Sequence, residues 1–75
     1  MEIKDFIEKF AEAVEIDDSS VLTPETKFRD LDEWNSLAVL SLLAMLDEEY
    51  DVQIQNAQLR ELNTLQDIVN FIEKQ

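Results

Sequence analysis

The chain of 75 residues carries eighteen acidic and six basic residues, a formal charge of −12, and contains no cysteine and no histidine. This charge argues against nucleic-acid binding and favours basic protein partners. Without cysteine or histidine there is no disulfide, no thiolate metal site and no histidine base, so we expect neither a metal site nor an enzyme. The length predicts a single domain, residues 1–75, with a modest core.

The first predicted helix is marked by apolar residues at helical spacing near the N-terminus. These residues are Ile3, Phe6, Ile7, Phe10 and Val14. Their aromatic side chains are expected in the core, because a small helical domain needs large apolar surfaces to exclude water. The same region lacks the pattern of a signal peptide, and no apolar run reaches membrane-spanning length. We therefore expect a cytoplasmic monomer without a membrane span.

Residues 17–35 form a connection longer than most loops between helices, so we expect local structure within it. Thr23-Pro24-Glu25 predicts one helical turn, with threonine as the N-cap and proline at the first helical position. Trp34 has two interpretations: it anchors the loop on the core, which its size favours, or it lies beside Ser36. Four further side chains are expected to fix the loop across the helices: Val21, Leu22, Phe28 and Leu31.

The densest apolar segment, Ser36–Tyr50, predicts a central helix with Asn35 as its N-cap. At about 100° per residue this helix has two faces. One face is expected to lie on the core: Val39, Leu42, Leu43, Leu46 and Tyr50. The opposite face is predicted to bind partner proteins: Leu37, Leu40, Ser41, Ala44, Asp47 and Glu48. The alternative is that a helix apolar on two sides is deeply buried.

Ser36 is expected in the first turn of the central helix, beside backbone N–H groups that have no partner within the helix. These donors and the positive end of the helix dipole favour an anion, so a phosphodiester on Ser36 would be well placed. The alternative is that this serine only caps the helix.

The remaining sequence predicts two more helices. Val52 and Ile54 alternate with polar residues in a short extended link, and Asn56 can then cap a brief helix that reaches Leu62. Thr64-Leu65-Gln66-Asp67 has the spacing of a capping box and precedes apolar residues at helical spacing: Leu65, Ile68, Val69 and Ile72. The predicted fold is therefore all-α, a small bundle of three longer helices plus one short helix.

The residues also resemble a known family over essentially the whole chain. Asn35-Ser36-Leu37, the helix end Asp47-Glu48-Glu49-Tyr50-Asp51, Val52-Gln53-Ile54 and Thr64-Leu65-Gln66-Asp67-Ile68 are similar to the acyl carrier proteins. The usual triplet in that family is Asp-Ser-Leu, and its serine receives 4′-phosphopantetheine, whose thiol carries an acyl group as a thioester. The resemblance implies attachment at Ser36, flanked by Asn35 and Leu37. It also implies a phosphopantetheinyl transferase and acyl-activating, condensing and processing enzymes with basic docking patches as partners.

Some residues depart from the family pattern. Asn35 replaces the customary aspartate, which keeps the capping geometry but removes a negative charge that a transferase could read. Ala38 and Ser41 stand where carboxylates are frequent, which suggests specialised partners. The resemblance further implies an acyl pocket between the helices, in which Leu59 is bulkier than usual and would favour short or polar cargo; ordinary core filling is the alternative. The matching positions are Phe28, Leu46, Ile54, Leu59, Leu62 and Ile68.

Three functions remain open from the sequence. The first is an acyl carrier of fatty-acid or secondary-metabolite biosynthesis. The second is a carrier of aminoacyl or aryl groups in a nonribosomal or cell-envelope pathway, whose cargo needs no long apolar tunnel. The third is an unmodified interaction domain whose acidic helix face binds a basic partner, with Ser36 as a cap only.

Overall fold

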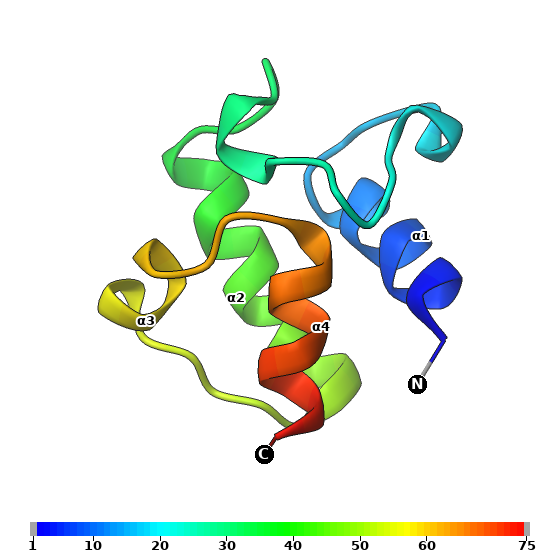
Figure 1. Ribbon diagram of the computed structural model, residues 1–75. Coiled ribbons are helices and arrows are strands. Elements are labelled where there is room, and N and C mark those ends of the chain that lie inside the picture. The colour runs from blue at the N-terminus through cyan, green and yellow to red at the C-terminus, as the bar shows by residue number, and fades with distance from the viewer. Residues whose placement is uncertain (1, 75) are drawn as a thin grey trace.

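The computed structural model describes residues 2–74, which form four α-helices, three of them longer, and no β-strand. In Figure 1, α2 lies between α3 and α1, and α4 crosses in front of it. The predicted all-α fold is confirmed. The helices are α1 (Ile3–Ala13), α2 (Ser36–Tyr50), α3 (Asn56–Arg60) and α4 (Leu65–Glu73), and two 3₁₀ turns, η1 (Ser19–Val21) and η2 (Phe28–Asp30), lie in the long connection.

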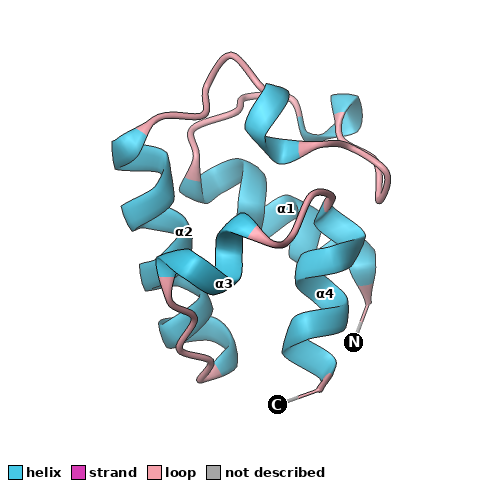
Figure 2. Ribbon diagram, turned by 60° about the vertical axis from the view of Figure 1, so that its left-hand side comes forward, coloured by secondary structure: helices cyan, strands magenta, loops and turns pink. Residues whose placement is uncertain are grey.

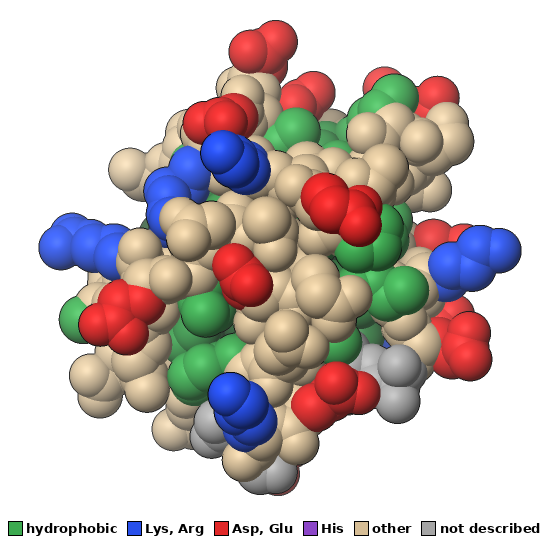
Figure 3. Space-filling model, viewed as in Figure 1, with side chains coloured by type: hydrophobic (Ala, Val, Ile, Leu, Met, Phe, Trp, Pro, Cys, Tyr) green, Lys and Arg blue, Asp and Glu red, His purple; other side chains and the backbone are tan. Residues whose placement is uncertain are grey.

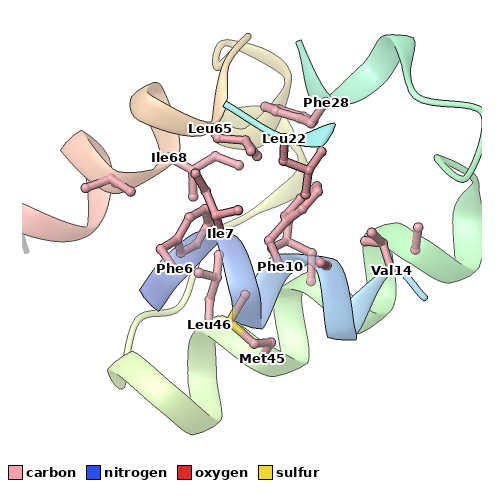
Figure 4. Close-up of a cluster of buried hydrophobic side chains, with 14 of the residues drawn as sticks. Phe6, Ile7, Phe10, Val14, Leu22, Phe28, Met45, Leu46, Leu65 and Ile68 are labelled. Atoms are coloured by element: carbon pink, nitrogen blue, oxygen red, sulfur yellow. The ribbon is translucent and has the colours of Figure 1, made fainter. Parts of the chain in front are cut away.

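The core lies where α1, α2 and α4 meet beneath the long loop (Figure 4). Phe6 and Phe10 of α1 are fully buried, with ring centroids 6.2 Å apart, and the ring of Phe6 also lies 6.1 Å from that of Tyr50 on α2. The predicted aromatic contribution of the first helix to the core is therefore confirmed. The other fully buried large side chains are Phe28, Leu42, Leu46, Leu65 and Ile68.

The buried face of α2 is rotated relative to the predicted one. Leu42 and Leu46 are fully buried as expected, but Ala38 and Met45 are buried as well, at 5% and 8% exposed. Three residues of the predicted core face are only half-buried: Val39, Leu43 and Tyr50. The rotation follows from the packing of α1 against α2, because Met45 and Ala38 both lie beside residues of α1 and its C-terminal end.

Two helices are followed by a residue in the left-handed conformation that glycine usually takes, although the chain contains no glycine. Glu15 takes a left-handed conformation with φ of 62° after α1, and the N–H of Ile16 donates to the carbonyl of Ala11 at 2.8 Å. This is a Schellman closure with glutamate in the position that glycine usually occupies. Asp51 takes φ of 54° after α2, and the N–H of Val52 donates to the carbonyl of Leu46 at 3.1 Å.

The long connection has local structure, as predicted. Residues 23–26 form the turn expected at Thr23-Pro24-Glu25, closed by the N–H of Thr26 on the carbonyl of Thr23 at 3.0 Å, but this turn is not helical; the helical turns are η1 and η2. Leu22 and Phe28 are buried and fix the loop, and Leu31 is half-buried against the core. Val21 is 63% exposed, so its predicted anchoring role is also wrong.

This loop crosses the ends of the helices (Figure 2) and closes the start of α4. The N–H groups of Leu65 and Gln66 donate to the carbonyls of Thr26 (3.2 Å) and Pro24 (2.9 Å). The predicted capping box is confirmed: the N–H of Asp67 donates to Thr64 Oγ1 and the N–H of Thr64 donates to Asp67 Oδ2, both at 3.1 Å. The backbone N–H groups in the first turn of α4 therefore donate partly to the capping threonine and partly to carbonyls of the long loop.

The short helix α3 differs slightly from its prediction. Asn56 is its first residue rather than its cap; Gln55 precedes it, and the N–H of Gln55 donates to Gln58 Oε1 at 2.9 Å. The helix ends at Arg60, before the predicted limit at Leu62. Across residues 2–74 no helix is long and apolar enough to cross a membrane.

Candidate functional site

Ser36 is the first residue of α2 and is exposed to solvent. Asn35 precedes it in an extended conformation, and Asn35 Oδ1 accepts the N–H of Ala38 at 2.8 Å. The predicted cap is confirmed. The asparagine side chain satisfies only one of the N–H groups in the first turn. The other N–H groups there have no partner within the helix, so an anion is favoured beside them.

Beside Ser36 the surface is hollowed by a pocket of about 420 Å³ between α2 and α3. Its apolar wall consists of Trp34, Val39, Leu40 and Leu59, and its polar residues besides Ser36 are Arg29, Asn56 and Arg60. An apolar wall with a few polar groups is the usual composition of a small-molecule pocket. We call this pocket the Ser36 hollow.

Trp34 fulfils both predicted roles. Its ring stacks on Phe10, with centroids 6.4 Å apart and planes at 13°, and it lies 5.0 Å from the ring of Phe28. The same side chain lines the Ser36 hollow. Trp34 therefore anchors the end of the loop that precedes α2 on the core.

Basic residues at the Ser36 hollow were missed from the sequence. Arg29 and Arg60 both line it, although the chain carries a net charge of −12. In Figure 3 basic side chains gather at the upper left, near α3 and the neighbouring loop, although others lie at the right edge and at the bottom, and acidic side chains are spread over the whole face. The spacing of Asn56 and Arg60, four residues apart on a helix, could have placed these two on one face. Arg29 gives no such signal, because a tertiary contact positions it.

Arg29 joins the loop to the end of α3. Its guanidinium donates to the carbonyl of Leu59 at 3.1 Å, to the carbonyl of Leu62 and to Asn63 Oδ1 at 2.9 Å. The last carbonyls of a helix have no partner within it, so a cation there is favourable. Arg29 therefore holds α3 at its place along the hollow.

The residues of the predicted acyl pocket lie mainly in the packed core. Five of the six are buried, and Leu62 is half-buried. Among them only Leu59 also lines the Ser36 hollow. The five buried ones are Phe28, Leu46, Ile54, Leu59 and Ile68.

The predicted partner-binding residues lie on the surface of α2. Leu37 and Leu40 are 67% and 63% exposed and lie on consecutive turns of the same helix, where exposed apolar side chains together can mark an interaction surface. Ala44, Asp47 and Glu48 are exposed, and Ser41 is half-buried. A second hollow of about 510 Å³ lies between α1 and α2. Ser41, Ala44 and Glu48 line it together with Lys9, Glu12, Ala13, Met45 and Glu49.

Comparison with known proteins identifies the family of the chain. Residues 4–72 match the family described as "Phosphopantetheine attachment site". The chain belongs to this family. It is 34% identical over 53 residues to an acyl carrier protein of Thermobifida fusca (strain YX), covering 71% of this chain and 67% of that protein. It is 40% identical over 40 residues to an acyl carrier protein of Campylobacter concisus (strain 13826), covering 53% and 52% of the two chains.

The chain is thus a phosphopantetheine-binding carrier domain, distantly homologous to acyl carrier proteins, and such domains are non-catalytic. Membership implies 4′-phosphopantetheine as the prosthetic group and modification by a phosphopantetheinyl transferase. The residues of the Ser36 hollow fit this group. An exposed hydroxyl is available for a phosphodiester, and two arginines give the hollow a positive charge. Trp34, Leu40 and Leu59 offer apolar surface to the uncharged part of the group.

Proposed function

We propose that Ser36 is the residue that receives 4′-phosphopantetheine. On this group the chain carries acyl intermediates as thioesters and presents them to enzymes of fatty-acid or secondary-metabolite biosynthesis. The observation that carries the proposal is an exposed serine at the first position of α2, at the edge of a hollow with apolar walls and two arginines. The thiol of the bound group supplies the thioester chemistry.

The residues around Ser36 would orient the attachment site without taking part in chemistry. Asn35 fixes the first turn of α2 through the N–H of Ala38, so the serine is held at a defined helix start. Leu37 is exposed beside it and is available to a transferase. The carrier would be a substrate and a scaffold for its partner enzymes.

The test is modification by a permissive phosphopantetheinyl transferase with coenzyme A, read by intact mass. One group should be added to the wild-type chain and none to Ser36→Ala. Ser41→Ala is the matched control, because this serine lies on the same helix but is half-buried and away from the helix start. Unchanged wild-type mass, under conditions that fully modify a control carrier, would contradict the proposal. Modification of Ser36→Ala would move the site elsewhere.

A carrier of short, aminoacyl or aryl groups is the second candidate, and the packing of the core favours it. Phe28, Leu46 and Ile68 are fully buried within the core, so a long chain would have to displace them. If cargo is short or polar, attached groups of increasing chain length should leave the melting temperature almost unchanged. A melting temperature that rises with chain length would support a long acyl cargo.

The surface of α2 is the proposed docking surface for partner enzymes. Leu37 and Leu40 supply apolar contact area, and Asp47 and Glu48 supply charges that complement a basic patch. Leu40→Ala should weaken binding to a partner enzyme without unfolding the domain. Glu48→Gln should mainly slow association and reduce its salt dependence, whereas Glu25→Gln, on the loop, should not. Equal association rates for the two charge variants would show that this surface of α2 is not part of the interface.

A further inference from the structure

The two arginines of the chain both line the Ser36 hollow but differ in their contacts. The guanidinium of Arg29 donates to three oxygens at the end of α3. Arg60 is exposed, and its guanidinium has no hydrogen bond or ion pair within residues 2–74. One arginine is therefore part of the framework, while the other is free to meet a ligand.

The position of this free cation matters in a chain with a net charge of −12. The chain has eighteen acidic residues and six basic ones, so an arginine has many potential carboxylate partners. Arg60 instead lies in the same hollow as the hydroxyl of Ser36. Arginine is well suited to a phosphate oxygen pair, because its planar guanidinium can donate two parallel hydrogen bonds.

We propose that Arg60 is the counter-ion of the phosphodiester on Ser36. The inference rests on the proposed attachment at Ser36 and adds the residue that holds the base of the prosthetic group against Trp34, Leu40 and Leu59. Arg29 acts indirectly, as a positioning residue: by binding the carbonyls of Leu59 and Leu62, it fixes the helix end that carries Arg60.

Nitrogen-15 NMR of the arginine side chains tests this directly, since only two Nε–H signals are expected from this chain. The Arg60 signal, assigned by its loss in Arg60→Gln, should shift when the apo protein is converted to the modified form. The shift should decrease as salt is raised from about 0.1 M to about 1 M, because the screening length falls from roughly 10 Å to 3 Å. The Arg29 signal should shift less, because three oxygens already hold its guanidinium.

Fluorescence of the single tryptophan provides the second measurement. Modification of the wild-type chain should reduce acrylamide quenching of Trp34, because the group is held against that side chain. Arg60→Lys, which keeps the charge but not the planar guanidinium, should keep part of the protection. Lys4→Gln, which removes a distant charge on α1, should behave like the wild type. Arg60→Gln should lose most of the protection, with a change of about twofold to fivefold in the ratio of held to free group.

The outcomes separate this inference from the proposed function. Intact mass reports attachment independently of both spectroscopic measurements. If the mass does not increase, attachment at Ser36 fails and the inference about Arg60 fails with it. If the mass increases but the Arg60 signal does not shift, or if Arg60→Gln protects Trp34 as well as the wild type does, attachment stands and the counter-ion role is overturned.

Discussion

The same long loop leads into the start of α2 and contacts the start of α4, yet the backbone N–H groups of the two starts are satisfied to very different degrees. At α4, Thr64 and Asp67 cap each other, and the loop carbonyls of Pro24 and Thr26 accept two more N–H groups. At α2, Asn35 accepts one N–H group and the next residue is an exposed serine. A helix start that the chain itself completes is structural, and one left partly open is available to an added group.

The largest difference between the two starts should come from apolar side chains. Phe28 is fully buried where the loop meets α4, so Phe28→Ala should lower the free energy of unfolding by about 3–5 kcal/mol. Leu37 is 67% exposed at the start of α2, so Leu37→Ala should change it by less than about 0.5 kcal/mol. Urea denaturation measures both. Similar losses would mean that the two starts are equally part of the core.

A smaller effect is expected from the cap of α4. Thr64→Ala removes the oxygen that accepts the N–H of Asp67 and should cost about 0.5–2 kcal/mol. Thr64→Ser keeps that oxygen and is the matched control. A loss for serine as large as that for alanine would show that the threonine methyl group, and not the cap, stabilises this start.

The capping carboxylate of α4 should also make stability depend on pH. Hydrogen bonds from the N–H groups of Asn63 and Thr64 lower the pKa of Asp67 below its ordinary value of 3.8. A lowered pKa contributes stability above the ordinary value, and this contribution is lost as the pH falls through the lowered pKa. Asp67→Asn should therefore lose less stability than the wild type between pH 5 and pH 2, roughly the range over which such a carboxylate titrates. Asp32→Asn, in the loop, is the charge-matched control, and equal acid sensitivity of the wild type and Asp67→Asn would exclude this role.

The smallest effect on stability is expected at the cap of α2. Asparagine and aspartate cap helices about equally well, so Asn35→Asp should change the free energy of unfolding by less than about 0.5 kcal/mol. It restores the charge customary in acyl carrier proteins and should speed modification by transferases that read aspartate. Initial rates of mass increase measure this, and equal rates for both proteins would show that the transferase does not read the charge.

The fold could be predicted from sequence because its signals are local. Apolar spacing marked the longer helices, and Asn35 and the pair Thr64–Asp67 marked two helix starts correctly. The rotation of α2 was not predictable, because α2 is apolar on two sides and only its contact with α1 decides that Ala38 and Met45 are buried. For the same reason the place of Arg29 was missed: its partners are about thirty residues further along the chain.

The candidate site was predicted in part. Ser36 and its cap followed from helix chemistry, and the exposed leucines followed from the angular spacing of the helix. The hollow beside the serine did not, because it is formed by α3, whose position depends on the tertiary bonds of Arg29. Local patterns thus identify the proposed attachment residue, but the surroundings that would receive its group arise from packing.

The two left-handed residues at the helix ends also affect the unfolded chain. Glu15 and Asp51 occupy a conformation that costs an ordinary residue roughly 1–2 kcal/mol, and glycine would avoid that cost. Glycine would also give the unfolded chain more conformations to lose, which destabilises by about 0.4–1 kcal/mol per site. With no glycine at any position, this chain has an unusually restricted unfolded ensemble. The strain at its two helix ends is thus partly offset by the smaller entropy of the denatured state, an effect that no contact in the folded structure reveals.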